Sequence, residues 1–569
     1  MSDTRVTGEG GPSAPTSSGV ALGAGVVVGL LVVVMSASYA SLIFRGPLAD
    51  RLPLGVAILL ASAVVHAVVL AFTSRFEGLV ARPQSPIVPI LGLMAAAIVV
   101  AVPEGSSDDT VLATVVAALI VASLLTGGVV GAIGVFGLGR FIRFIPHPVI
   151  GGFLAGSGYL LLRGGLQVLL ESDVLVGAGD AWVDRWEVWV PGILFALLTT
   201  VVLRRSRHPL ALPALIVGGI GLFYAAALVA GVDFAEVRAA GWFLVDIDGR
   251  TLWQGIDASL LDDVEWLVVA AQWPSFATVA LVSAVSVLLT LTAMELQTGN
   301  DADLDRELRS AGLSNVLAGL AGGVVGYHSL SLSTLAGKLG ARSRAIGIVV
   351  ALVAAGALFV DARPIGLVPV WLVGGLLCYL GIEFLIEWLW EARRTLTRGD
   401  FLVVVLIVVT TGLVGYIQAI GLGVVLAVVL FVVKYSRVDA VKHLLSGRDH
   451  RSNVERPRAD RELLRVHGDR IRLIVLQGFV FFGTASRVLE SVRAMFLEPE
   501  SMHPSYLVVD FRRVTGMDSS ATMSLAKLLR LAGTHDCVVV LSGLEGDLRR
   551  QVEASEVGPF DPVILKDLD

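Results

Sequence analysis

Long apolar runs follow one another through the first three quarters of the chain and predict membrane-spanning helices. A helix needs about 20 predominantly apolar residues to cross the hydrocarbon core of a bilayer, which divides the runs into about fourteen segments. These segments start near residues 19, 52, 84, 110, 146, 189, 210, 274, 308, 327, 344, 366, 400 and 419. The pattern therefore predicts a polytopic α-helical membrane protein.

Two of the segments are too short or too interrupted to cross a bilayer as single helices. One opens at Gln84, Ser85 and Pro86, and the other opens near Tyr327. They are the third and tenth segments, which are equivalent positions if the chain consists of two sets of seven. Paired interrupted helices at equivalent positions are typical of transporters built from inverted repeats, with the substrate between them. We therefore expect about fourteen transmembrane segments in two inverted repeats of seven.

The pattern changes after residue 434, where charged residues become frequent and the apolar runs become short. Strand-like runs at 471–483, 506–510 and 537–543, and a last one near Val563, alternate with helical stretches. This alternation predicts a small α/β domain with a central sheet. We expect a disordered tail at residues 1–18, a transmembrane domain at 19–436, a linker at 437–461 and the soluble domain at 462–569.

Composition supports this division and argues against several classes of function. The chain is 55% hydrophobic and 16% charged, with a net charge of -6, so binding of nucleic acid is not expected. The two cysteines, Cys378 and Cys537, stand in different expected domains, which argues against a disulfide framework. The sequence has no phosphate-binding loop, zinc-protease motif or nucleophile elbow, so we do not expect an enzyme.

The distribution of basic residues predicts the orientation of the chain in the membrane. With the N-terminus in the cytoplasm, the cytoplasmic connections carry Arg140, Arg143, Arg204, Arg205, Arg207, Lys338, Arg342, Arg344, Arg393, Arg394, Arg398, Lys434 and Arg437. The acidic stretches 104–109 and 233–263 fall on the outside, although Arg45 and Arg51 are exceptions. By the positive-inside rule, we expect a multi-pass protein of the plasma (inner) membrane with both termini in the cytoplasm.

The candidate substrate-binding residues lie in or next to the interrupted segments. They are Tyr39 in the first segment, Gln84 and Ser85 in the third, and Tyr327, His328, Ser329 and Ser331 in the tenth. Serine and histidine at membrane depth suit an interrupted helix whose backbone lines a cavity. His328 has an alternative interpretation as a packing residue, Gln84 and Ser85 as helix caps, and Tyr39 as a packing aromatic.

Glu295 lies near the end of the eighth apolar segment and is the candidate residue for a coupling ion. A carboxylate buried in a bilayer costs roughly 2.5 to 3.5 kcal/mol on insertion scales, and a bound H+ or Na+ would relieve that cost. Thr298 is grouped with Glu295 in this expected coupling-ion site. No other cofactor and no metal centre is expected. The alternative is that Glu295 lies in the cytoplasmic interface, where it needs no ion.

Several motifs resemble one known family over nearly the whole chain. They are SASYA at 36–40, PHPVIGGFLAG at 146–156, the residues Glu307, Leu308, Gly312, Asn315, Gly319, Gly322 and Gly323, and the following GVVGYHSLSLST. These motifs are similar to those of the sulfate permease (SulP) family of anion transporters with a C-terminal STAS domain. The resemblance implies two inverted repeats of seven spans, a substrate between the third and tenth half-helices, elevator-type transport and a homodimer.

The sequence departs from the family pattern where the substrate would bind. Positions 34–35 are Val-Met in place of Pro-Gln, and positions 85–86 are Ser-Pro in place of Gly-Pro. Many members open the tenth helix with Ser-Arg-Ser/Thr, whereas residues 331–333 are Ser-Leu-Ser, so that arginine is missing. Two helix N-termini together offer about one positive charge, which suits a monoanion, and sulfate would need about one more. Sodium-coupled relatives have an acidic residue at the position of Glu295, which favours cation-coupled uptake.

Asp510 and the residues Met-Asp-Ser-Ser-Ala at 517–521 resemble the STAS motif. We expect Asp518 and the serines after it to cap a helix. In anti-sigma antagonist relatives the serine after the aspartate is phosphorylated, and Ser519 is the matching position. Asp518 and Ser519 are therefore candidate regulatory residues, with capping alone as the simpler interpretation. We expect this domain to support dimerisation and regulation.

The leading hypothesis is a secondary active transporter of a small anion such as sulfate, bicarbonate or a carboxylate, coupled to H+ or Na+. One alternative is an amino-acid carrier of the same fold, because some fungal vacuolar relatives with a similarly altered tenth helix are linked to basic amino acids. Another is a membrane sensor or scaffold that presents the STAS domain. The expected partners are membrane lipid, the anion, a second copy of the chain and a cytosolic regulator of the STAS domain.

Overall fold

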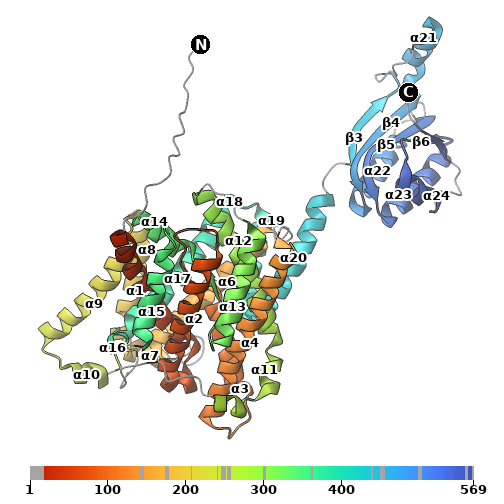
Figure 1. Cartoon of the computed structure of the whole chain (residues 1–569). Coiled ribbons are helices and arrows are strands. Elements are labelled where there is room, and N and C mark those ends of the chain that lie inside the picture. Colours follow the sequence, from red (N-terminus) through yellow and green to blue (C-terminus); the bar gives the residue numbers. More distant parts are fainter. Residues whose placement is uncertain are drawn as a thin grey trace, which may run out of the picture. The chain divides into compact units, whose positions relative to one another are not determined.

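The computed structural model describes residues 18–139, 146–172, 179–206, 208–239, 241–244, 252, 258–298, 303–359, 363–436, 440–448, 455–497, 503–555, 557 and 562–566. The chain divides into two compact units, Met1–Leu426 and Ala427–Asp569 (Figure 1).

The first unit is a bundle of apolar helices. Among the described residues, eight helices are long and apolar enough to cross a membrane by length and composition. The main helices are α1 (Ser18–Ile43), α2 (Leu52–Thr73), α3 (Val88–Ala101), α4 (Asp108–Val135), α6 (His147–Leu170), α8 (Trp186–Arg205), α9 (Ala211–Ala230), α12 (Trp273–Thr298), α13 (Leu304–Leu320), α14 (Leu330–Lys338), α15 (Ala345–Phe359), α17 (Val370–Leu385), α19 (Arg398–Leu413) and α20 (Tyr416–Ser436). The boundary between the two units falls within α20. Shorter helical pieces are η1 (Gly46–Arg51), α7 (Gly179–Asp184), α10 (Phe234–Ala239), η2 (Ala258–Asp263), α11 (Trp266–Ala271), α16 (Arg363–Gly366), the π-helix η3 (Ile386–Glu391) and α18 (Ala392–Thr395).

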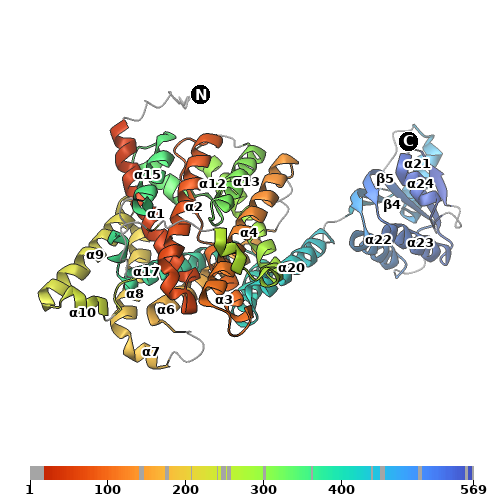
Figure 2. The same ribbon diagram turned by 60° about the horizontal axis from the view of Figure 1, so that its bottom comes forward.

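Helices from the two halves of the bundle interleave. The helix α15 packs on α1 and α2, and α4 packs on α12 and α13, so segments far apart in the sequence lie side by side (Figures 1 and 2). The helices α6 and α17 pack on each other, α8 packs on α17, and α19 packs on α6. The first seven main helices (α1, α2, α3, α4, α6, α8 and α9) can be paired in order with the last seven (α12, α13, α14, α15, α17, α19 and α20). When each helix is exchanged for its pair, every one of these contacts becomes a contact in the same set. The two halves therefore pack in an equivalent way.

Glycines allow the closest of these contacts. A Cβ built on Gly312 of α13 would lie 2.5 Å from the Cα of Gly131 in α4, so the two backbones touch directly. A Cβ on Gly319 would lie 2.8 Å from Cγ of Leu124 in α4, and one on Gly323 would lie 2.5 Å from Oγ of Ser62 in α2. Small residues permit such close approach between membrane helices. The contact fixes α13 against α2 and α4, and α13 leads directly into the tenth segment.

The second unit is an α/β domain built on a sheet of five strands. The strand order is β3 (Val441–Ser446), β4 (Ile471–Val480), β5 (Tyr506–Met517), β6 (Val538–Ser542) and β7 (Val563–Leu565). The pair β3 and β4 is antiparallel, whereas β4 to β7 are parallel. The helices are α21 (Arg458–His467), η4 (Gly468–Arg470), α22 (Phe482–Met495), α23 (Ser519–Gly533) and α24 (Gly546–Glu553). Strands β4 to β7 lie where the alternating pattern places them.

One strand of this sheet lies in the segment that we assigned to a linker at 437–461. Residues 441–446 form β3, which pairs with β4, and α21 follows within the same charged stretch and ends at His467. The strand is at the edge of the sheet and most of its side chains are at least partly exposed, so its sequence lacks an apolar run. Backbone pairing with β4 holds it in place. The α/β domain therefore includes residues before 462.

Candidate functional site

Two three-residue strands join the third and tenth segments. The strands β1 (Ala81–Pro83) and β2 (Gly326–His328) pair in antiparallel register, with Ala81 opposite His328 and Arg82 opposite Tyr327. The amide of Ser329 donates to the Val80 carbonyl at 2.8 Å and continues the pairing. All six residues of the two strands are buried. The two interrupted segments therefore meet through their backbones, as the sequence predicts.

A short helix begins just after each strand. The helix α3 follows β1 after a turn, and α14 follows β2 at once. Neither Ile87 nor Ser329, the N-cap residues, provides a side-chain cap. The first amides of a helix have no intrahelical partner and carry the positive end of its dipole. The strand pair thus brings together two uncapped helix N-termini, and α12 contacts α3, β2 and α14 beside them.

Most of the substrate-binding candidates gather around the strand pair. Six of them, Tyr39, Gln84, Ser85, Tyr327, His328 and Ser329, are buried. The Gln84 side-chain amide donates to the carbonyls of Arg82, at 3.2 Å, and Tyr327, at 3.0 Å, so it ties the two strands together. The Ser329 hydroxyl is buried and has no hydrogen-bond partner among the described residues. Ser331 differs, because it is exposed on the first turn of α14.

The strand β2 is held by polar groups of α2 and α13. The Asn315 side chain donates to the Gly326 carbonyl at 2.8 Å and accepts from the Gly326 amide at 3.0 Å, so it pairs with β2 as a neighbouring strand would. His66 of α2 lies against the same glycine, because a Cβ built on Gly326 would lie 2.4 Å from His66 Cδ2. The His66 ring itself is 3.0 Å from the Val324 carbonyl and 3.2 Å from the Ser314 hydroxyl. Gly326 therefore has no room for a side chain.

A fully buried acid and base lie at the end of β2. The Glu307 Oε2 and His328 Nε2 atoms are 3.0 Å apart, and neither side chain is exposed. The other carboxylate oxygen accepts a hydrogen bond from the Arg75 backbone amide at 2.7 Å. Glu307 therefore links α13, β2 and the connection between α2 and β1. The Nδ1 atom of His328 is buried and has no partner among the described residues. The sequence-based prediction includes Glu307 only as part of a family motif, and the charged residues around it at the start of α13 do not mark it as buried.

A buried arginine in β1 is not among the residues predicted from the sequence. Arg82 is 3% exposed, and its Nη1 atom donates to the Tyr39 hydroxyl at 2.9 Å and to the Pro83 carbonyl at 2.8 Å. The expectation of about one positive charge at the site counted the two helix N-termini and excluded position 332, and it did not consider Arg82. Leu332 is 2% exposed and packs in an apolar cluster with residues of α1 and α15. The signal was an arginine alone in the uncharged stretch 78–86.

The two coupling-ion candidates lie at the end of α12. Glu295 is half-buried in the last turn of this helix, and Thr298 is its final residue. The Thr298 side chain lies outside the described part of the structure. The helix α12 contacts β2 and α14, so both candidates lie on a helix that packs against the tenth segment. The role of both residues in ion binding stays a prediction.

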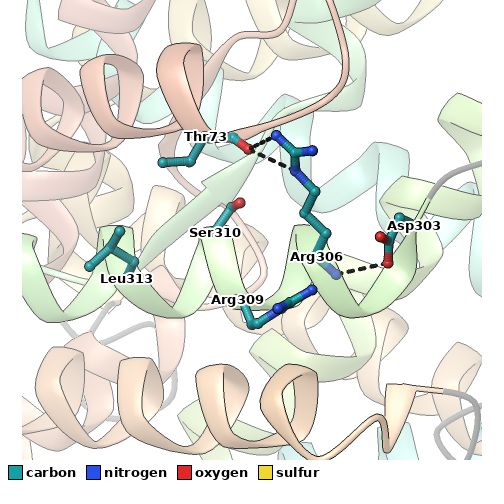
Figure 3. Close-up of a pocket in the computed structure, with 6 residues that line it drawn as sticks. All are labelled: Thr73, Asp303, Arg306, Arg309, Ser310 and Leu313. Atoms are coloured by element: carbon teal, nitrogen blue, oxygen red, sulfur yellow. Dashed lines mark hydrogen bonds between the residues drawn. The ribbon is translucent and has the colours of Figure 1, made fainter.

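An open depression of about 470 Å³ lies where α2 ends and α13 begins (Figure 3). It is lined by Thr73, Asp303, Arg306, Arg309, Ser310 and Leu313. The Arg306 guanidinium donates to the Thr73 carbonyl, and the Arg306 amide donates to the Asp303 carboxylate at 3.1 Å. Glu307 is the next residue along α13, so the depression adjoins the helix that carries the buried acid. Its lining is basic and open to solvent.

The α/β domain shows the expected helix cap. The Asp518 carboxylate accepts a hydrogen bond from the Ala521 amide at 2.7 Å and caps the N-terminus of α23. Ser519 is exposed at the first position of this helix. Asp510 is buried at the end of its pairing with β6 and accepts hydrogen bonds from Arg512. Phosphorylation of Ser519 stays a prediction.

Comparisons with known families agree with the two units. Residues 21–408 match the model of the sulfate permease family, and residues 464–566 match that of the STAS domain. The first match covers more than half of the chain. The resemblance seen in the sequence is therefore confirmed.

Two curated relatives have different substrates in their names. The vacuolar basic amino acid transporter VSB1 of Saccharomyces cerevisiae is 26% identical over 559 residues, which are 95% of this chain and 54% of the yeast protein. The chain thus spans about half the length of that relative. The bicarbonate transporter BicA of Synechocystis is 24% identical over 508 residues, which are 86% of this chain and 84% of BicA.

Among solved structures, the fold is similar to that of the murine Slc26a9 anion transporter in the inward-facing state. The TM-score is 0.65 at 15% identity, and the match covers 94% of this chain and 87% of that one. At this identity, the likeness concerns the fold.

Proposed function

The chain belongs to the sulfate permease family, a family of membrane transporters and not of enzymes, and we propose that it is a secondary active transporter of a small anion. The observation that carries this proposal is the pair of strands β1 and β2, which brings two uncapped helix N-termini to one buried place. Backbone amides at the positive end of a helix are suited to bind an anion. The substrate class is sulfate, bicarbonate or a carboxylate, and the mode of transport is elevator-type alternating access.

The proposed architecture is fourteen membrane segments in two inverted repeats of seven, within a transmembrane domain at residues 19–436. A helix begins close to each of the fourteen starts expected from the sequence. Exchange of the two halves reproduces the packing pairs, such as α2 with α15 and α13 with α4. The antiparallel pairing of β1 with β2 suits two half-helices that enter the membrane from opposite sides. We place both termini in the cytoplasm and the protein in the plasma (inner) membrane.

A competition experiment tests the function. The purified chain in proteoliposomes should take up labelled anion saturably, and the uptake should follow an imposed H+ or Na+ gradient. Bicarbonate, sulfate, a dicarboxylate and lysine are then compared as competitors. Competition by one of the anions and not by lysine supports the proposal. Uptake of lysine without uptake of any anion would refute it.

Coupling is proposed to use Glu295, with Thr298 beside it. A half-buried carboxylate at the end of a membrane helix gains stability from a bound cation. We expect Glu295→Gln to reduce gradient-driven uptake by about tenfold or more while exchange of labelled for unlabelled anion persists. Exposed Glu77, changed to Gln in the same way, is the control. An unchanged rate and unchanged ion dependence in Glu295→Gln would assign this residue to the interface instead.

Two alternatives remain as hypotheses. An amino-acid carrier is favoured by the likeness to VSB1, which covers most of this chain, although the chain spans about half of VSB1. A sensor or scaffold that presents the STAS domain would show binding of partners without saturable flux. The competition experiment separates all three.

We propose that the STAS domain supports a homodimer and regulation by a cytosolic partner, with Ser519 as the candidate phosphorylation site. A deletion that tests this role should begin at residue 437, because β3 belongs to the sheet. A deletion that begins after Arg461 would leave β3 without its partner strand. Unchanged dimerisation and unchanged uptake after the longer deletion would remove the role.

A further inference from the structure

Arg82 buries a positive charge beside the two helix N-termini. It lies in β1 opposite Tyr327, only 3% of its surface is exposed, and its guanidinium carbon is 5.5 Å from the centre of the Tyr39 ring. Both of its hydrogen bonds leave from Nη1, toward the Tyr39 hydroxyl and the Pro83 carbonyl. The Nε atom is buried and has no hydrogen-bond partner among the described residues.

Within the described part of the chain, no carboxylate neutralises this charge. Among the described residues, no carboxylate lies within ion-pair distance of Arg82. The buried carboxylate of the region, Glu307, is bound to His328 and to the Arg75 amide. The neighbouring N-termini of α3 and α14 are themselves positive ends of dipoles, so they add to the charge. A buried cation without a counter-charge is strongly unfavourable, and an arginine does not lose its proton to relieve it.

The free edge of the guanidinium points to a particular ligand shape. With Nη1 occupied by two acceptors, the donors that remain belong to Nε and Nη2. The Nε and Nη2 donors of arginine form a planar pair that matches two oxygens on one atom of a carboxylate or similar anion. A bound oxyanion would satisfy the orphan donor and neutralise the charge together. The two helix N-termini and Arg82 contribute about two positive charges, which suits a doubly charged oxyanion as well as a monoanion.

We propose that Arg82 is a substrate-binding residue and that the substrate is an oxyanion held through the Nε edge of its guanidinium. This inference rests on the proposed anion transport. Arg82 supplies from β1 the fixed charge that position 332, occupied by buried Leu332, does not supply from α14. A substrate with no net negative charge would leave the charge of Arg82 uncompensated.

The test compares Arg82→Gln and Arg82→Lys with a control, Arg75→Gln. The control removes an exposed charge from the connection between α2 and β1. Uptake of labelled sulfate and bicarbonate is measured with the purified full chain in proteoliposomes. For the oxyanion that the wild type transports, we expect Arg82→Gln to raise KM by about tenfold or more. Arg82→Lys keeps the charge without the planar donor pair and should raise KM by roughly threefold. Arg75→Gln should leave KM within about twofold of wild type.

Thermal denaturation separates binding from a structural role. The same oxyanion should raise the melting temperature of the wild type and of Arg75→Gln, and it should not raise that of Arg82→Gln. Without anion, Arg82→Gln should melt at or above the wild-type temperature, because it buries no unpaired charge. A lower melting temperature together with an unchanged KM would make Arg82 purely structural and overturn the inference. If Arg82→Gln does not fold, an unchanged KM in Arg82→Lys overturns it. Absence of anion uptake by the wild type would instead refute the proposed function.

Discussion

Replacement of Gly326 by valine should abolish uptake. A Cβ at this position would lie 2.4 Å from His66 Cδ2 and 2.7 Å from the Arg82 carbonyl of the paired strand. His66 cannot move away freely, since its ring contacts the Val324 carbonyl and the Ser314 hydroxyl. Overpacking of this kind costs roughly 1 to 3 kcal/mol or more. The valine should therefore separate β1 from β2 and displace the N-termini of α3 and α14, which follow these strands. Uptake of labelled anion in proteoliposomes measures the effect.

Gly337→Val is the matched control. This glycine lies in α14, and a Cβ built on it meets no other atom within 4 Å. It should fold and transport close to wild type, apart from the small cost of a β-branched residue in a helix. Normal uptake by Gly326→Val would mean that the strand pair does not position the site.

Replacement of Glu307 by alanine should produce the largest loss of stability. It removes the acceptor of the His328 imidazole and of the Arg75 amide, and leaves a buried histidine with no partner on either nitrogen among the residues that the structure describes. Loss of one member of a buried pair costs about 3 to 5 kcal/mol. We expect a melting temperature many degrees below wild type in detergent, and loss of uptake.

Glu77→Ala removes an exposed carboxylate from the connection between α2 and β1 and serves as the control. The double variant of Glu307→Ala with His328→Ala should be little less stable than Glu307→Ala alone, because each change removes the same interaction between the two side chains. The buried pair would not link α13 to β2 if Glu307→Ala melted at the temperature of Glu77→Ala. The same conclusion would follow if the stability losses of the two single variants, Glu307→Ala and His328→Ala, added up in the double variant.

Hydrophobic patterning was sufficient to locate the helices and the two interrupted segments. Helix length in a membrane is set by bilayer thickness, and interruption leaves a visible mark of Gln84, Ser85 and Pro86 or of Tyr327 to Ser329. The parallel strands β4 to β6 were equally visible, because buried strands read as continuous apolar runs. These features depend on local composition, which a sequence displays directly.

The features that were not predicted depend on contacts between separate segments of the chain. The isolation of Arg82 in an uncharged stretch is a sign of burial, but only its pairing with Tyr327 places it beside the tenth segment. The partner of Glu307 is His328, across the turn between α13 and β2, so periodicity along one helix does not reveal it. The edge strand β3 is held by backbone hydrogen bonds to β4 and needs no apolar pattern.

The most direct test is a structure of the full chain in lipid nanodiscs, determined by electron cryo-microscopy with a saturating concentration of the oxyanion that it transports. We expect density for the anion within hydrogen-bonding distance of Arg82 Nε and of the first amides of α3 or α14. Anion density only elsewhere, for example in the depression lined by Arg306 and Arg309, with none beside Arg82, would contradict binding between the two half-helices.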